Sequence, residues 1–181
     1  MLKVIVAIVV AIAAMVGIVT FVGSRLPVSH VASRTVTIGA PTDVVFNTMT
    51  DFGSSPAWRT GLKSVTVTTD PTTGRQRVTE DSKDGKMTME VEQFVPPTRF
   101  VTRIVDEGLP YGGAWAHALE AQGNTTRVTI TEHGEVYNPI FRFISNYIMG
   151  HTGTMDAYLT ALGKKFGNEV TPVDAAPVPL K

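Results

Sequence analysis

The most apolar stretch of the chain lies at its beginning. Residues Val4 to Gly23 read VIVAIVVAIAAMVGIVTFVG, with no charged side chain and with Thr20 as the one polar residue. A helix rises about 1.5 Å per residue, so a run of roughly 20 residues spans about 30 Å, the thickness of the hydrocarbon core of a bilayer. The pattern therefore predicts a transmembrane helix in residues 1–25, which would contact the bilayer through residues 4–23.

A cleaved signal peptide is the alternative interpretation of this run. Its apolar region is typically only about 7–15 residues long, so the length favours a retained single-pass anchor. The triplet Val22-Gly23-Ser24 nevertheless forms a weak cleavage site. Basic residues flank both ends, with Lys3 before the run and Arg25 and Arg34 after it, so the side of the membrane on which the rest of the chain lies stays undetermined.

After this run, apolar and polar residues alternate with a period of two, the pattern of half-buried strands. Short turns rich in Gly, Pro, Asp and Asn separate the runs, which favours antiparallel hairpins. The predicted strands cover residues 31–38, 62–69, 75–80, 86–94, 99–105, 114–120 and 125–136. A helix is predicted to begin at Pro41, with Val45 and Met49 one turn apart on its buried side.

The end of the chain changes to a helical period. Asn138 and Pro139 are typical of a helix start, and Gly167 is typical of a C-terminal cap. The apolar stripe between them steps by three and four residues through Ile144, Ile148, His151, Met155, Leu159, Leu162 and Phe166. We therefore expect one long amphipathic helix that lies across an antiparallel sheet, an α+β fold, and a disordered proline-containing tail over residues 168–181.

Composition narrows the possible chemistry. The chain has 16 Lys and Arg against 16 Asp and Glu, so no basic field favours nucleic-acid binding. It contains no Cys, which excludes disulfides, thiolate nucleophiles and cysteine-ligated metals. Glu132 and His133 are neighbours in a strand and point to opposite faces, so we expect no metal site. Phosphate-binding loops and the serine hydrolase motif are missing from the sequence, and we expect no cofactor.

Three segments in this order carry a resemblance to a known family. They are APTDVVFNTMTDFGSSPAW from residue 40, VEQFVPPTRFVTRI from residue 91 and GLPYGGAWAHALEAQGNTTRVTITEHGEV from residue 108. The chain resembles the SRPBCC superfamily over residues 29–167, and within it the polyketide cyclase/dehydrase and lipid-transport group of START-like domains. The resemblance implies a helix-grip fold over residues 26–167: a curved antiparallel sheet wraps the C-terminal helix, and a cavity between them holds a lipid, sterol or polyketide-like molecule.

The resemblance brings no universal catalytic residues. The positions that recur in the family correspond to Asp51, Trp58, Pro97, Gly113 and Trp115, and most of them are determinants of the fold. His117 departs from the pattern, since related sequences often place an aromatic or apolar residue there. It introduces a polar group into the expected cavity.

Strand alternation indicates which side chains line that cavity. Successive side chains of a strand point to opposite faces of the sheet. In residues 114–120 the large residues therefore share one face and the alanines share the other, and the following strand divides in the same way. The expected lining residues are Met87, Met89, Tyr111, Trp115, His117, Leu119, Val128, Ile130, Glu132, Ile148, His151 and Met155. The two methionines would adapt to an irregular ligand, although they serve equally well as core residues.

His117 and Glu132 admit two interpretations. They could bind a ligand headgroup or, with Tyr111, act as acid and base. Alternatively they could be a buried pair that satisfy one another, or Glu132 could lie in water at the rim of the sheet. We favour this structural role because every buried polar group needs a partner. His151, between Gly150 and Gly153, is equally open between facing a ligand and bonding a neighbour.

Three functional hypotheses follow. The first is a membrane-anchored protein that binds a small hydrophobic or amphiphilic molecule, and we expect binding rather than turnover. The second is an enzyme of the cyclase or dehydratase type that uses His117 and Glu132. The third is a scaffold that binds no ligand because its own side chains fill the interior.

Overall fold

The computed structural model describes residues 1–83 and 85–181. Within these residues, one antiparallel sheet of eight strands has the order β2-β3-β4-β5-β6-β7-β1-β8. The strands are β1 Ser29–Ile38, β2 Leu62–Thr69, β3 Gln76–Ser82, β4 Gly85–Val95, β5 Arg99–Ile104, β6 Tyr111–Gln122, β7 Thr125–Val136 and β8 Val173–Asp174. The predicted antiparallel sheet is confirmed.

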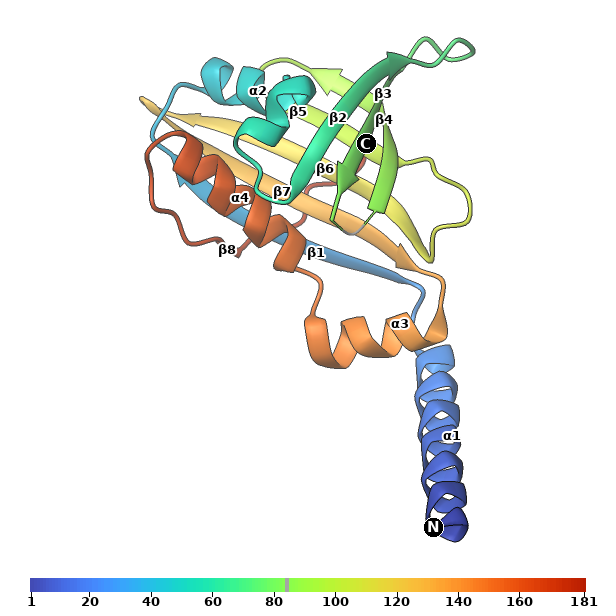
Figure 1. Cartoon of the computed structure of the whole chain (residues 1–181). Helices are drawn as coiled ribbons and strands as arrows, with labels where there is room; N and C mark the ends of the chain where they lie inside the picture. The colour runs from blue at the N-terminus through green and yellow to red at the C-terminus, as the bar shows by residue number, and fades with distance from the viewer. Residues whose placement is uncertain (84) are drawn as a thin grey trace.

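Helices close one face of this sheet and extend from one end of it. They are α1 Leu2–Arg25, α2 Thr42–Thr50, the 3-10 helix η1 Phe52–Ala57, α3 Pro139–Ile144, the π-helical turn η2 Ser145–Met149 and α4 Gly153–Lys165. Figure 1 shows the sheet curving around α4, while α1 projects away from the domain. The expected helix-grip, α+β architecture is thus confirmed.

The core lies between the concave face of the sheet, α2 and α4. It joins strand residues such as Val78, Phe100 and Ile130 to α4 residues such as Leu159, all of them almost completely buried. Alternation along β6 follows the prediction, because Leu119 belongs to this core while the alanines of the same strand belong to the opposite face. The two faces of the sheet are therefore covered by different parts of the chain.

The predicted single closing helix is interrupted. After η2, Gly150 has φ +74°, a left-handed conformation that favours glycine, and its N–H donates to the Ser145 carbonyl at 2.9 Å. The chain then begins α4 at Gly153. The apolar stripe is buried at Met155, Leu159 and Leu162 and partly buried at Phe166, whereas Ile148 is 71% exposed.

The tail was expected to be disordered, but the structure places it against the sheet. Val173 and Asp174 pair with β1, and Val178 N–H donates to Thr131 Oγ1 at 2.8 Å. Val178 and Leu180 pack on a small apolar patch of the convex face formed by Val101, Ala114 and Ala116. The difference has a physical reason: small side chains on that face leave room for an extended, proline-rich segment to cover them.

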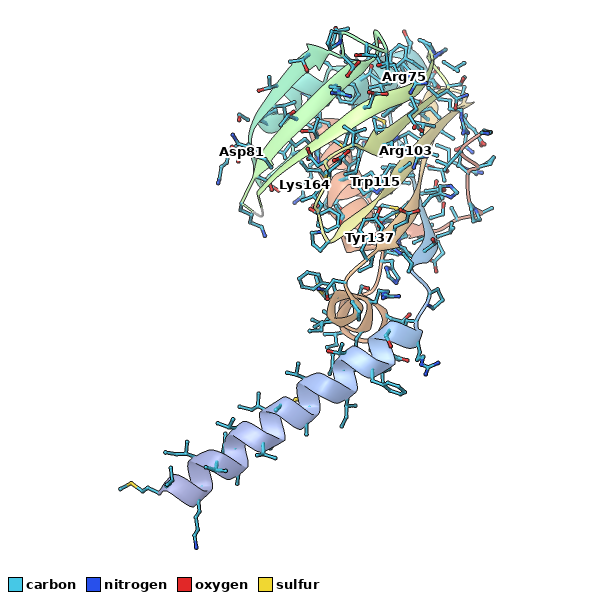
Figure 2. The ribbon with its side chains drawn as sticks, turned by 90° about the vertical axis from the view of Figure 1, so that its right-hand side faces the viewer. Arg75, Asp81, Arg103, Trp115, Tyr137 and Lys164 are labelled. Carbon is cyan, nitrogen blue, oxygen red and sulfur yellow. The ribbon has the colours of Figure 1, made fainter. Side chains whose placement is uncertain are left out.

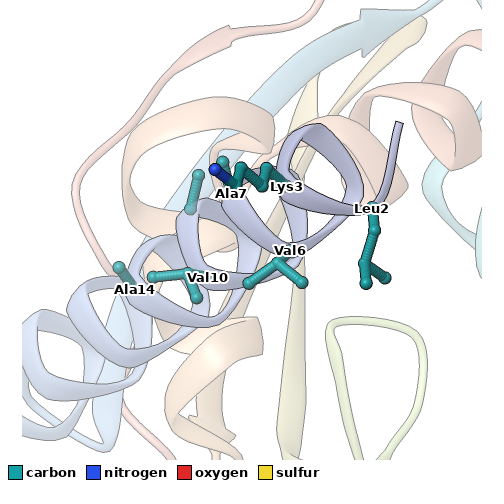
Figure 3. Close-up of a pocket in the computed structure, with 7 residues that line it drawn as sticks. Leu2, Lys3, Val6, Ala7, Val10 and Ala14 are labelled. Carbon is teal, nitrogen blue, oxygen red and sulfur yellow. The ribbon is translucent and has the colours of Figure 1, made fainter.

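Helix α1 stands apart from the domain. Its most apolar window of 18 residues has a mean hydropathy of 3.0 and none of that window is buried, so the length and composition of α1 suffice to cross a membrane. A signal sequence near the N-terminus has the same properties. A shallow hollow follows its side and is lined only by residues of α1 itself (Figure 3). That hollow lies on a lone apolar helix and is not the cavity expected between sheet and helix.

A close contact joins the end of α1 to α3. Gly23 is the buried residue of α1, and a Cβ atom there would lie 1.9 Å from the Pro139 carbonyl oxygen. Arg142 Nη1 donates to the Leu26 carbonyl at 3.0 Å, across the same joint. Glycine is thus required at position 23 for α1 and α3 to approach this closely.

Candidate functional site

Polar and aromatic side chains gather on the concave face between the sheet and α4. We call Trp58, Arg59, Glu80, His117 and Tyr158 the inner cluster. They come from the segment after η1, from β3, from β6 and from α4, and so they meet only in the folded chain. Sequence reasoning had singled out His117 as a site residue and treated Trp58 as a fold determinant; Arg59, Glu80 and Tyr158 were missed.

An ion pair sits at the centre of the inner cluster. Both guanidinium nitrogens Nη1 and Nη2 of Arg59 donate to the Glu80 carboxylate, the second at 3.0 Å, and the Glu80 side chain is only 9% exposed. The Arg59 guanidinium also lies 4.9 Å from the centre of the Tyr158 ring, within the range of a cation–π contact. The two opposite charges leave the cluster with no net charge.

His117 is held as a neutral ring. It stacks on Phe100 with a centroid distance of 3.9 Å and an interplanar angle of 8°. Burial lowers the pKa of His117 to about 3; a hydrogen bond with the Phe100 backbone opposes this lowering, and the positive charge of Arg59 adds to it. A group with such a pKa carries no proton to donate as an imidazolium near neutral pH, which argues against His117 as a general acid.

Two polar atoms of the inner cluster are buried without a partner. Within the described residues, His117 Nδ1 and Trp58 Nε1 make no hydrogen bond. Their rings flank Tyr158, with centroid distances of 6.2 Å for His117 and 5.3 Å for Trp58. An unsatisfied buried polar group costs about 1–3 kcal/mol, so this pair calls for an explanation other than stability.

A second group of polar side chains lies where β1, β7 and η2 meet. We call His30, Glu132 and His151 the rim cluster. Glu132 Oε1 lies 3.0 Å from His30 Nε2, and the His30 ring stacks on His151 at a centroid distance of 3.7 Å. Burial lowers the pKa of His151, and the neighbouring His30 adds to the effect. His151 therefore packs against a neighbouring imidazole by stacking.

Trp115 connects the two clusters. Its Nε1 donates to Glu132 Oε2 at 3.1 Å, and its ring centre lies 6.0 Å from that of His117 and 6.2 Å from that of Tyr158. Figure 2 shows Trp115 on the sheet beside α4. Trp58 and Trp115 are the only two tryptophans of the chain, and both belong to or pack against the core on the concave face.

The structure does not bring His117 and Glu132 together as a hydrogen-bonded pair. In the register of β6 and β7, His117 lies opposite Ile130, and Glu132 lies opposite Trp115. The imidazole that contacts Glu132 is that of His30, which sequence reasoning missed. A signal was present in Gly134: a Cβ atom at that position would lie 2.3 Å from His30 Cε1, so the glycine makes room for the imidazole.

The other expected lining residues divide into three groups. Leu119, Val128, Ile130 and Met155 are buried in the core, and Met89 packs against it. Met87 is half-buried on β4. Tyr111 and Ile148 are 42% and 71% exposed, which places neither among the buried side chains of the concave face.

Two hollows of the structure lie away from the inner cluster, one along α1 and one near the rim cluster. A small one, of about 120 Å³, lies beside the rim cluster at the joint of α1 and β1. It is lined by Leu26, Pro27, Val28, Ser29, His30, Val136, Arg142, Ser145, Asn146 and His151. In the inner cluster, Trp58, Glu80, His117 and Tyr158 are themselves buried. Among the residues that the structure describes, no three His, Asp or Glu side chains are grouped to hold a metal ion.

Solved structures share this fold at low sequence identity. A conserved protein from Geobacillus kaustophilus aligns with a TM-score of 0.64 and 15% identity, covering 79% of this chain and 99% of its own. The Zhui aromatase/cyclase from Streptomyces sp. R1128 gives 0.63 and 12%, covering 77% and 94%. A START superfamily protein from Mycobacterium smegmatis gives 0.57 and 14%, covering 76% and 97%. At these identities the likeness concerns the fold alone.

Sequence comparison gives a more specific result. No curated protein matches the chain. A family profile described as polyketide cyclase/dehydrase and lipid transport matches residues 29–167, which include both clusters and every strand of the sheet except the two-residue β8. The domain has the helix-grip fold that the START superfamily protein shares, and the chain belongs to the polyketide cyclase/dehydrase and lipid transport family.

Proposed function

We propose that the chain is a membrane-anchored protein that binds a small, mainly apolar molecule on its concave face. The observation that carries the proposal is the pair of buried, unpartnered atoms His117 Nδ1 and Trp58 Nε1, whose rings pack on Phe100 and Tyr158. Polar oxygen atoms of a ligand would satisfy these groups, and sites for small molecules typically combine an apolar lining with a few polar atoms. Entry requires side chains of the inner cluster to move, since they close it in this structure.

The charges of the inner cluster favour an uncharged polar group on the ligand. Arg59 is already neutralised by Glu80, and His117 is neutral. Burial raises the pKa of Tyr158, so its hydroxyl stays protonated. A hydroxyl or carbonyl group on an apolar body fits these conditions better than a carboxylate or an amine, because an ion would be desolvated here without a partner. Sterols, fatty alcohols and polyketide-like ketones are of this class.

Helix α1 supplies the anchor in this proposal. A domain tethered to a bilayer meets lipid-soluble molecules at a high effective concentration, so a modest affinity suffices. The protein would be single-pass. Removal of α1 as a signal sequence is the alternative, and it would leave the same domain free of the membrane.

Catalysis of the cyclase or dehydratase type is the second candidate, and one observation favours it. The 3.0 Å contact between His30 and Glu132 is an arrangement in which a carboxylate orients an imidazole, as acid–base catalysis requires. The fold is also that of the Zhui aromatase/cyclase. His117 is a poor acid by its pKa, so this candidate now rests on Glu132 with His30 and not on the pair His117 and Glu132. A scaffold without a ligand remains the third candidate, because side chains close the inner cluster.

The test compares two histidines on opposite faces of the sheet. His117→Phe keeps a ring that can stack on Phe100 but removes Nδ1, whereas His133→Phe alters the convex face, where His133 Nε2 contacts the Val178 carbonyl at 2.8 Å. The probe is a dansyl-labelled long-chain alcohol, titrated into the full chain in lipid nanodiscs. We expect His117→Phe to weaken binding about tenfold, the value of one hydrogen bond of about 1.4 kcal/mol, and His133→Phe to leave it unchanged. Equal affinities of both variants and the wild type would refute the proposed site.

A further inference from the structure

An apolar surface lies outside the core, on the segment that leads from the sheet to α4. Four residues of α3 and η2 are well exposed: Phe141 at 47%, Tyr147 at 59%, Ile148 at 71% and Met149 at 75%. We call these four residues the apolar face of α3–η2. Large side chains of this kind, grouped within nine residues, are typical of a surface that meets a partner or a membrane.

The position of this face relative to α1 indicates which partner it meets. The start of α3 is fixed against the end of α1 by the close approach of Gly23 to Pro139 and by the bond from Arg142 to the Leu26 carbonyl. Figure 1 shows α3 running crosswise at the end of α1 nearest the domain. A bilayer crossed by α1 would therefore have its surface at the level of α3.

We infer that the apolar face of α3–η2 inserts into the headgroup layer of the bilayer that α1 crosses. The inference rests on the proposed anchor and adds a second contact with the same lipid surface. Aromatic and aliphatic side chains on a segment that lies in the interface plane bind lipid in this way, with basic residues close by. Arg25, whose guanidinium lies 5.2 Å from the centre of the Phe21 ring, ends α1 at this level, and Arg142 belongs to α3 itself.

Such insertion would place the rim cluster next to the lipid. His151 follows Met149 by two residues, and its ring stacks on His30, so η2 ends directly at the rim. The hollow of about 120 Å³ lies at this place, because residues of β1, α3 and η2 line it together with His151. An apolar molecule leaving the bilayer would thus reach the concave face by way of η2 without crossing open water.

The absence of cysteine from the sequence makes the test direct, because a single introduced cysteine can be labelled alone. We would prepare the full chain with Ile148→Cys, Val10→Cys or Thr72→Cys, attach an environment-sensitive nitrobenzoxadiazole label, and reconstitute each in vesicles of phosphatidylcholine and phosphatidylglycerol. Val10 reports on α1. Thr72 is exposed in the turn between β2 and β3, which lies at the far end of the domain from α1 (Figure 1).

We expect the label at position 148 to emit at shorter wavelength than at position 72, and to be quenched by lipids carrying a spin label near the headgroup. The label at position 10 should be quenched by lipids labelled deep in the acyl chain, and the label at position 72 by neither. Met149→Cys provides a second test of the same face if Ile148→Cys does not fold.

Three results would overturn the inference. Quenching at position 10 without quenching at 148 and 149 would leave the anchor in place and remove the second contact. No quenching at any position would show that α1 itself is outside the bilayer, and the proposed anchor would fail together with the inference. A shift to shorter wavelength at 148 that lipid quenchers do not affect, and that grows with the protein-to-lipid ratio, would assign the face to a second copy of the chain.

Discussion

Replacing Arg59 by methionine is expected to lower the free energy of unfolding by about 3–5 kcal/mol, because it leaves a buried carboxylate without its counter-charge. The Glu80 side chain is 9% exposed and receives both of its charged hydrogen bonds from Arg59. Methionine keeps most of the side-chain volume, so the loss would reflect charge and not a cavity. Urea unfolding of the full chain, followed by tryptophan fluorescence, measures the change.

The control for this experiment is the double variant Arg59→Met/Glu80→Met. Replacing both members of a buried ion pair by apolar residues is often neutral or stabilising, so the double variant should recover most of the lost stability. If the double variant is as unstable as Arg59→Met, the loss comes from packing around Tyr158 and the ion pair is not the cause.

Acidification is expected to destabilise the fold through His117. The unfolded chain binds a proton on this residue near pH 6.5, whereas the folded chain binds it only near the lowered pKa of about 3. Between these values the unfolded state holds more protons, so the free energy of unfolding falls by about 1.4 kcal/mol for each pH unit below 6.5 and is unaffected above it.

His117→Phe removes this dependence and serves as the comparison. Urea unfolding at pH 7 and pH 5 should show a loss in the wild type that exceeds the loss in the variant by about 2 kcal/mol. The remaining histidines and carboxylates titrate in both proteins, so the difference isolates His117. A pH dependence that is the same in both proteins would mean that His117 is protonated in the folded chain and that its burial is not as described.

Much of the fold follows from local patterns. Alternation in β6 was sufficient to place Leu119 inside and Ala114 and Ala116 outside, because side chains of a strand point to opposite faces in turn. The motifs around Trp58 and Trp115 were sufficient to predict the family to which the chain belongs. These features depend on spacing within one segment, which a single sequence contains.

Features that depend on pairing between distant segments escaped prediction. Arg59 and Glu80 are charged residues of a loop and a strand, and nothing in their spacing indicates that they meet on the concave face of the sheet. The contact between His30 and Glu132 was missed for the same reason. The break at Gly150 and the ordered tail were missed because helix period and proline content describe local preference, whereas tertiary packing determines both outcomes.

The central claim, that the concave face takes a polar atom of an apolar ligand, is tested most directly at the two indole N–H groups. Trp115 Nε1 already donates to Glu132, whereas Trp58 Nε1 has no partner among the described residues. With ¹⁵N-labelled indoles in the full chain in nanodiscs, only two indole resonances arise, and titration with dodecanol reports on each. We predict that the Trp58 resonance shifts downfield and saturates as its N–H gains an acceptor. If neither indole resonance moves while dodecanol fills the nanodisc, the concave face binds no such ligand and the domain is a closed scaffold.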